Sequence, residues 1–186
     1  MIQKIAVFCG SSAGNRPEYA QAARRLGECL GRSGRTLVFG GCLDGLMREV
    51  SQAALQSGGR IESEFIRGLY RESDHLPGAT EHIYDTLEER KAGLIGHSEA
   101  CIVLPGGMGT LDEFSELFAR IQLGLPRRPL GLLNTLGYYD PLAAMLQRMR
   151  EEGFLSAEWD GLVIIKSSPE ELFSEMDRRM ESYRRV

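Results

Sequence analysis

The sequence has no long apolar run and no leader-like beginning. No stretch of its 186 residues approaches the roughly 18 uninterrupted apolar residues typical of a membrane-spanning helix. Met1 leads directly into the strand-like IAVFC of residues 5–9, without the charged, apolar and small-residue parts of a secretory signal. We therefore expect a cytoplasmic protein with no membrane partner.

Cysteine and histidine are scarce and scattered. The four cysteines form no C-x-x-C pair, and the three histidines (His75, His82 and His97) show no metal-ligand spacing such as H-E-x-x-H. The sequence therefore predicts no metal, no zinc site and no disulfide framework. Buried, reduced thiols are expected instead.

An excess of charge is also missing. The net charge is −4, and no block of like charge exceeds the short arginine-rich end, so nucleic acid and anionic membranes are poor candidates as partners. The length fits one domain spanning residues 1–186. A small molecule is the ligand class that remains.

What the sequence does have is a regular alternation of strand-like and helical runs. Strands are expected at residues 5–9, 36–39, 61–66, 101–104, 130–134 and 161–165. Helices are expected at residues 17–30, 46–56, 86–97, 111–123, 141–152 and 169–184. This alternation predicts an α/β fold, a doubly wound parallel sheet with helices on both faces.

Three of the expected strands end in glycine or serine loops. These loops contain Gly10-Ser11-Ser12, Gly40-Gly41 and Gly106-Gly107. In open α/β sheets, ligands bind outside the carboxyl ends of the strands. The three loops should therefore converge on one binding site.

The segment CIVLPGGMGTLDE, residues 101–113, is the most informative of the three. Its glycines let the backbone approach an anion, and a helix expected to start at Thr110 directs N–H groups at it. Glu113 should lie one turn into that helix, near the bound anion. Thr110 and Glu113 also have the spacing of a capping box, which needs no ligand, but a box leaves the Gly106-Gly107 pair unexplained.

Common phosphate-binding motifs are missing from these loops. No lysine follows the glycines as in a Walker A loop, and no G-x-G-x-x-G fingerprint is present. Lys91 is the one plausible Schiff-base lysine for a pyridoxal enzyme, but it lies beside Arg90, and a paired cationic site for an anion is the simpler interpretation.

Several motifs, taken together, carry a family resemblance. They are CGSS (9–12), FGGCLDGLM (39–47), LEERKAGL (87–94), PGGMGTLDEFSE (105–116) and QLGLPRRPLGLLNTLGYYDPL (122–142). In this order they resemble the LOG family, the cytokinin riboside 5′-monophosphate phosphoribohydrolases, often labelled lysine decarboxylases. The resemblance implies a Rossmann-like homodimer without cofactors that cleaves a nucleoside 5′-monophosphate into free base and ribose 5-phosphate.

The residue types suit that chemistry. Cleavage of a glycosidic bond needs a carboxylate that stabilises the sugar cation or activates water, and Glu113 fits this role. By the resemblance, Arg90 is its catalytic partner; the alternative is a surface arginine paired with Glu89 or Asp85. The resemblance also implies substrate-binding roles for Gly40, Gly41, Lys91, Gly106, Gly107, Met108, Gly109, Thr110 and Asp112.

Five further candidates have equally ordinary alternatives. Glu72 aligns with a family glutamate that contacts substrate, but it could be a solvated loop charge. Glu116 could raise the pKa of Glu113 or simply face water. Ser11 and Ser12 could bind ribose or phosphate or form a plain turn, and Met47 could be pocket wall or core.

The resemblance breaks in the third expected strand. The family usually has an apolar strand of the type VIGVIP there, whereas this chain carries Glu62 and Glu64, which are costly in a buried strand unless paired or exposed. The strand could be short, or the stretch up to Thr80 could be rebuilt; in the family it helps to form the base end of the pocket. We expect a purine-type substrate, AMP-like or a cytokinin nucleotide. A non-catalytic nucleotide-binding module and a phosphoribosyl-transferring relative remain the alternatives.

Overall fold

The chain is organised around a parallel sheet whose strand order places the first strand in the middle. The computed structural model describes residues 1–125, 128–156 and 161–184. Within them, seven strands follow the order β4-β3-β2-β1-β5-β6-β7, and all pairs are parallel. The strands are β1 (Lys4–Phe8), β2 (Thr36–Phe39), β3 (Arg60–Ile66), β4 (Thr80–Tyr84), β5 (Ala100–Val103), β6 (Leu130–Leu133) and β7 (Val163–Lys166).

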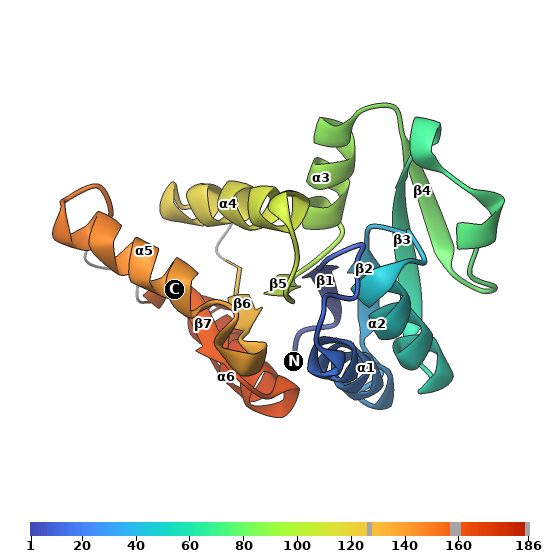
Figure 1. Ribbon diagram of the computed structural model, residues 1–186, viewed down its shortest axis with the longest axis horizontal. Helices are drawn as coiled ribbons and strands as arrows, with labels where there is room; N and C mark the ends of the chain where they lie inside the picture. Colours follow the sequence, from blue (N-terminus) through green and yellow to red (C-terminus); the bar gives the residue numbers. More distant parts are fainter. Residues whose placement is uncertain (126–127, 157–160, 185–186) are drawn as a thin grey trace.

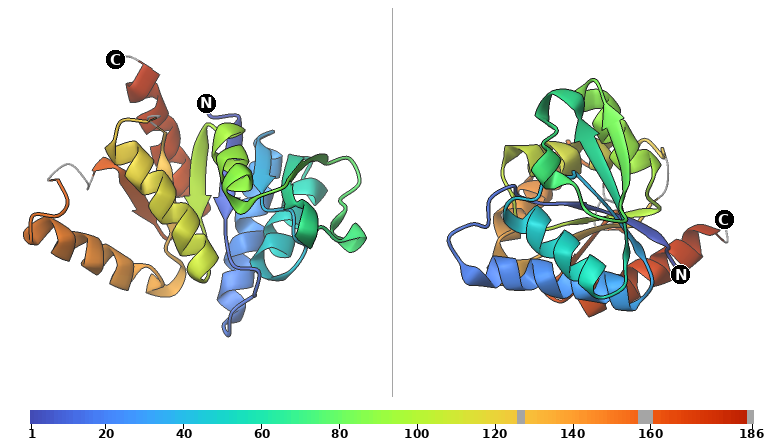
Figure 2. Two further views of the ribbon diagram at one scale, coloured as in Figure 1. Left: turned by 90° about the horizontal axis from the view of Figure 1, so that it is seen from above. Right: turned by 90° about the vertical axis from the view of Figure 1, so that its right-hand side faces the viewer.

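Helices cover both faces of this sheet (Figure 1). They are α1 (Pro17–Arg32), α2 (Gly45–Gln56), α3 (Leu87–Gly96), α4 (Met108–Gln122), α5 (Asp140–Glu151) and α6 (Pro169–Arg184). The back face is the one covered by α1, α2 and α6, and the front face is the one covered by α3, α4 and α5; each has its own cluster of buried apolar side chains. Figure 2 shows the two helix layers from further directions. The predicted Rossmann-like, doubly wound α/β fold is confirmed.

On the back face, α1 and α2 are so close that their contact leaves no room for a side chain on Gly27. α1 meets α2 at Gly27, where an added Cβ would lie 2.9 Å from the main-chain nitrogen of Ala54 and from the side chain of Ala53. Leu26, Leu30 and Val50 are fully buried around this contact. Close-packed interiors of this kind tolerate little added volume.

The front face has a more polar character near the carboxyl ends of the strands. Its core includes the stacked rings of Phe114 and Phe118, whose centroids are 5.7 Å apart. Thr110 and Glu64 are buried polar residues on this side of the molecule. Among the described residues, no helix is both long and apolar enough to cross a membrane.

Two regions differ from the sequence expectation. No strand or helix was expected between residues 66 and 86, and this stretch contains the strand β4 and the short 3-10 helices η1 (Arg67–Leu69) and η2 (Glu72–Asp74). α4 begins at Met108 rather than at Thr110, because Gly107 is the residue that precedes its first turn. The glycines around this start weaken the helical pattern in the sequence.

The charged strand β3 is not short. It has seven residues, of which the first four pair with β2 and the last five pair with β4. Glu62 forms an ion pair with Lys4 at 2.6 Å, and Glu64 contacts His97 at 2.8 Å. The two carboxylates are therefore accommodated by partners within a strand of full length, which is how their burial cost is reduced.

Candidate active site

The loops after β1 and β5 meet where the strand order reverses. The amide of Gly10 donates to the carbonyl of Pro105 at 3.0 Å, and the carbonyl of Gly10 accepts from the amide of Leu46 at the start of α2, also at 3.0 Å. These bonds join two of the three predicted loops and the helix that follows the third. The predicted convergence at the carboxyl edge is therefore confirmed for the loop backbones.

The glycine loop after β5 is shaped by a close approach to its own helix. An added Cβ on Gly106 would lie 2.7 Å from the Cβ of Thr110 and 2.8 Å from the amide nitrogen of Gly10. In contrast, an added Cβ on Gly107 or Gly109 would meet nothing within 4 Å. The loop thus packs tightly through Gly106 and leaves open space beside the N-terminus of α4, where helical N–H groups attract anions.

The capping-box alternative for Thr110 and Glu113 is wrong. Thr110 lies inside α4, Gly107 occupies the capping position, and no side chain caps this helix end. The capping box that does form is on α3, where Thr86 and Glu89 bond reciprocally to each other's backbone. It fixes the start of the helix that carries Arg90.

Arg90 is the point at which the loops and the acid are connected. Its guanidinium donates to the carbonyl of Glu64 at 2.9 Å, to the carbonyl of Gly40 at 3.3 Å and to Oε1 of Glu113 at 3.3 Å. The side chain is 11% exposed. The surface-arginine alternative is therefore wrong: Asp85 pairs with Arg67 instead, and the carboxylate of Glu89 accepts from backbone amides.

Glu113 is buried with a single cationic contact. Its side chain is 14% exposed and touches Arg90 through one oxygen. Desolvation by burial raises the pKa of Glu113 to about 7, although Arg90 acts in the opposite direction. A carboxyl with this pKa exchanges its proton near neutral pH, as acid and base catalysts require.

Lys91 faces two carboxylates on α4. Its ammonium lies 2.9 Å from Asp112 and 3.0 Å from Glu116, and hydrogen bonds to both raise the pKa of Lys91. Glu116 also bonds to Arg120. The structure supports neither alternative weighed for Glu116: its contacts are with two cations, and it is not among the groups that shift the pKa of Glu113.

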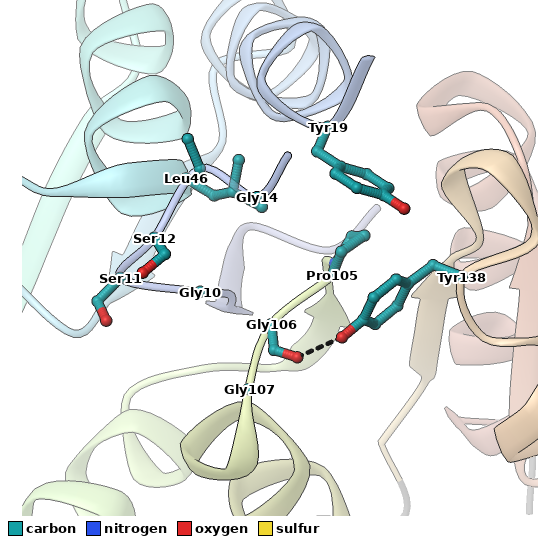
Figure 3. Close-up of a pocket in the computed structure, with 11 residues that line it drawn as sticks. Gly10, Ser11, Ser12, Gly14, Tyr19, Leu46, Pro105, Gly106, Gly107 and Tyr138 are labelled. Atoms are coloured by element: carbon teal, nitrogen blue, oxygen red, sulfur yellow. Dashed lines mark hydrogen bonds between the residues drawn. The ribbon is translucent and has the colours of Figure 1, made fainter. Parts of the chain in front are cut away.

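Three hollows surround the glycine loop. The acid hollow, about 290 Å³, is lined by Glu113, Arg90, Thr110, Gly107 and Gly109 together with Cys9, Gly10, Ser11, Met47 and Met108. The serine hollow, about 250 Å³, contains Ser11, Ser12 and Tyr138 (Figure 3). The tyrosine hollow, about 470 Å³, lies between α4 and the start of α5 and is lined mostly by apolar side chains. The acid and the loop therefore face one open cavity.

Tyr138 is a site residue that sequence reasoning missed. Its hydroxyl donates to the carbonyl of Gly106 at 2.6 Å, a bond drawn in Figure 3, and its ring lines both the serine and the tyrosine hollows. The ring also packs edge-on against Tyr19, with centroids 5.8 Å apart. The only sequence signal was the Tyr138-Tyr139 pair just after an expected strand.

Some predicted residues lie apart from the acid hollow. Glu72 is exposed in η2 and lines none of the three hollows. Gly41 is buried against the ring of Phe65 with a φ of 82°, a conformation that favours glycine. Ligand contacts by these two residues stay predictions, and Met47 contributes to the pocket wall.

The prediction of no metal rested on sequence spacing, and folding brings distant residues together. Among the described residues, Glu62, Glu64, His82 and His97 each offer a ligand atom within 4.8 Å of the others. The ligands come from β3, β4 and the end of α3, so no local motif could reveal them. This group lies outside the three hollows.

These features define a class: a Rossmann-like α/β protein with a glycine loop at a helix N-terminus beside a largely buried acid. A family model described as "Possible lysine decarboxylase" matches residues 47–176. The "Probable cytokinin riboside 5'-monophosphate phosphoribohydrolase LOGL1" of Oryza sativa subsp. japonica is 37% identical over 186 residues, covering 98% of this chain and 82% of that protein. The "Cytokinin riboside 5'-monophosphate phosphoribohydrolase LOG1" of Arabidopsis thaliana is 37% identical, covering 99% of this chain and 87% of that protein. The chain belongs to the LOG family, as the motifs predicted.

Solved structures share the fold at lower identity. The molybdenum cofactor carrier protein of Chlamydomonas reinhardtii has a TM-score of 0.72 at 16% identity, covering 97% of this chain and 99% of that one. The molybdenum cofactor binding protein of Rippkaea orientalis has a TM-score of 0.70 at 20% identity, covering 96% and 97%. At these identities the likeness concerns the fold alone.

Proposed function

We propose that this chain hydrolyses the N-glycosidic bond of a nucleoside 5′-monophosphate, releasing a free base and ribose 5-phosphate. The observation that carries the proposal is the acid hollow, in which a buried carboxyl with a pKa of about 7 faces the open side of a glycine loop. The names of the curated relatives support the same reaction.

The phosphate end of the substrate belongs at the start of α4. Gly107 and Gly109 leave space for an anion there, and the N–H groups and dipole of the helix favour negative charge. Thr110 faces the same hollow. Lys91, although paired with Asp112 and Glu116, adds positive charge on the neighbouring helix.

The glycosidic bond then lies toward Glu113. Hydrolysis passes through a cation-like sugar, and an ionised carboxylate can stabilise that cation or accept a proton from the attacking water. Arg90 holds the carboxylate in place and is itself fixed by the carbonyls of Gly40 and Glu64. Its charge is therefore available to orient the phosphate or to polarise the departing base.

The base is best accommodated on the side of Tyr138. The tyrosine ring lines two hollows next to the glycine loop and offers a flat apolar face for stacking. Leu111, Phe114 and Leu142 add apolar surface in the larger hollow. A purine-type base, AMP-like or of the cytokinin type, suits this environment.

Decarboxylation of lysine, which the family description mentions, is not favoured by these residues. A Schiff-base lysine needs a lowered pKa, whereas Asp112 and Glu116 raise the pKa of Lys91. A non-catalytic nucleotide-binding module is the other alternative. A buried carboxyl beside an anion site weakens anion binding, so its presence supports catalysis rather than binding alone.

The single domain, the homodimer and the cytoplasmic location stay predictions within this proposal: the first depends on chain length, the second on the resemblance, and the third on the absence of signal-like and membrane-spanning segments. Transfer of the ribosyl phosphate to an acceptor other than water would use the same pocket. Product analysis separates the two reactions, because hydrolysis alone yields ribose 5-phosphate.

The test is to incubate the purified protein with matched pairs of nucleosides and nucleoside 5′-monophosphates and to measure free base and ribose 5-phosphate. We expect release from monophosphates only. Equal release from nucleosides would contradict the role given to the glycine loop. Nucleotide binding without release of base would favour the non-catalytic alternative.

A further inference from the structure

A second cluster of titratable side chains lies at the edge of the sheet formed by β3 and β4. Glu62 and Glu64 come from β3, His82 from β4, and His97 from the residue that ends α3. One ligand atom from each lies within 4.8 Å of the others. The three elements lie side by side on the right of Figure 1.

The contacts inside the cluster are short and directed inward. Nδ1 of His97 lies 2.8 Å from Oε1 of Glu64, and Nε2 of His82 lies 4.0 Å from Oε2 of Glu62. The two imidazole rings are tilted against each other with centroids 4.3 Å apart. Two imidazoles and two carboxylates therefore face one small volume.

The environment of Glu64 is an independent indication that a ligand could bind between these side chains. The residue is fully buried, and its Oε2 atom has no partner of hydrogen-bond geometry in the described part of the chain. The polar group beside this oxygen is the Tyr84 hydroxyl, and both atoms lie within 3.0 Å of the position that a Cβ on Gly93 would occupy. One phenol and one imidazole compensate a fully buried carboxylate only in part, and a cation would complete the compensation.

We propose that Glu62, Glu64, His82 and His97 bind one divalent transition metal ion, with zinc as the best match. Imidazole nitrogen and carboxylate oxygen are both zinc ligands, and imidazole selects against magnesium and calcium. Zinc bonds of about 2.1 Å place tetrahedral ligand atoms roughly 3.4 Å apart. The His97–Glu64 pair at 2.8 Å has to open slightly and the His82–Glu62 pair at 4.0 Å has to close slightly to reach that spacing.

The charges and the exposure of the cluster allow the ion to enter. Two carboxylates are balanced by one ammonium, Lys4, whose side chain is 44% exposed and can leave Glu62 for water. His82 and His97 are 32% and 37% exposed, so the ion has a route past the rings. The metal replaces the hydrogen bond between His97 and Glu64.

A metal at this place would fasten the helix that carries Arg90. Glu64 binds the cluster with its side chain, while its carbonyl accepts the 2.9 Å bond from Nε of Arg90. His97 lies two turns beyond Arg90 at the end of α3. The ion would thus clamp β3, β4 and α3 together without entering the acid hollow, which gives it a structural role.

The test is zinc titration by calorimetry of the full chain after treatment with EDTA. We expect one zinc per chain at micromolar free metal, and a melting temperature higher by about 5 °C with saturating zinc. Magnesium should give neither effect. Glu64→Gln and His97→Ala should each lower zinc affinity at least tenfold.

Two matched controls define the specificity of the result. His75→Ala removes a histidine that pairs with Glu81 at 2.8 Å, outside the cluster, and should leave zinc binding unchanged. Tyr84→Phe removes a polar partner of Glu64 but no ligand atom, and it should lower zinc affinity by less than either ligand variant. Zinc binding that survives Glu64→Gln and His97→Ala, or that is lost in His75→Ala, would overturn the proposal.

Cobalt binding can be tested on the wild-type chain, so this experiment does not depend on whether a variant folds. Cobalt(II) added to the EDTA-treated wild-type chain should produce the visible absorption bands of a four-coordinate site, and added zinc should remove them. No bands, together with no heat on zinc addition, would mean that the cluster is a hydrogen-bonded network of histidines and carboxylates only.

Discussion

The two faces of the sheet solve different problems. On the back face, α1 and α2 approach each other through Gly27, and apolar side chains fill the space around them. On the front face, α3 and α4 are separated by polar side chains, of which Arg90 and Glu113 are largely buried. Both faces have an apolar core, but the largely buried ion pair lies between the helices of the front face.

This difference explains why the front face tolerates a poorly compensated acid. The Arg90–Glu113 contact uses one oxygen at 3.3 Å, so the attraction does not cancel the desolvation that raises the pKa of Glu113. Functional sites often retain such costly groups while the remaining structure provides the stability. In this protein, the close-packed back face contributes to that stability.

The strongest test of this comparison is Glu113→Gln. We expect kcat to fall by about 10³-fold, because the amide cannot stabilise the sugar cation or accept a proton. Nucleotide binding, measured by calorimetry, should persist. The melting temperature at pH 8 should rise, because the variant has no buried charge to desolvate. Normal turnover would remove Glu113 from the mechanism.

Arg90→Lys tests the connecting role of the guanidinium. Lysine keeps the charge but cannot donate to Gly40, Glu64 and Glu113 in the same fixed geometry. We expect kcat/KM to fall by about 100-fold. Arg24→Lys is the matched control: Arg24 pairs with Glu49 on the helices of the back face, and its replacement should leave kinetics unchanged.

Gly27→Ala tests the back face, where a substitution should change stability and leave catalysis unchanged. The added methyl group collides with the main chain of α2, and we expect the free energy of unfolding to fall by about 2–3 kcal/mol. Gly96→Ala, also at a helical glycine but with nothing within 4 Å, should raise it by up to about 0.5 kcal/mol. Urea unfolding measures both. The pH dependence of kcat/KM should stay that of the wild type in each.

The remaining prediction concerns the pH dependence of the wild type. The pKa of Glu113 is raised, so its carboxyl is neutral below pH 7, and kcat/KM should fall about tenfold per pH unit below that value. The same shift makes the folded state bind the proton more tightly, so this group costs stability as pH rises from its usual pKa of 4.5 through 7. A rate that is flat between pH 5 and 8, measured as kcat/KM, would contradict an ionised catalytic form.

Most of the fold could be predicted from sequence because its strands are apolar on both sides. β2 coincides with the predicted residues 36–39, and α6 with residues 169–184. β4 was missed because it is an edge strand whose residues, Thr80 to Tyr84, include few buried apolar positions. Periodicity detects burial, and an exposed edge provides little of it.

The parts of the candidate site that depend on local helix geometry could be predicted from the sequence. The parts that depend on tertiary contacts could not. The glycine loop and Glu113 share one short segment, so their proximity followed from helical geometry. Tyr138 reaches the loop from beyond β6, and the histidines come from separate elements. The start of α4 was misplaced because glycines on both sides of Met108 resemble loop.

The corrected start of α4 sets a fixed length for the substrate. Glu113 is the fifth residue after Met108, and at about 1.5 Å of rise per residue its Cα lies roughly 7.5 Å along the helix from that of the first residue. A rigid helix keeps this interval constant, so it can serve one arrangement of phosphate and scissile bond. Nucleotides phosphorylated at the 3′ position, or carrying a 5′-diphosphate, would present the bond at the wrong depth and should escape cleavage even when they bind.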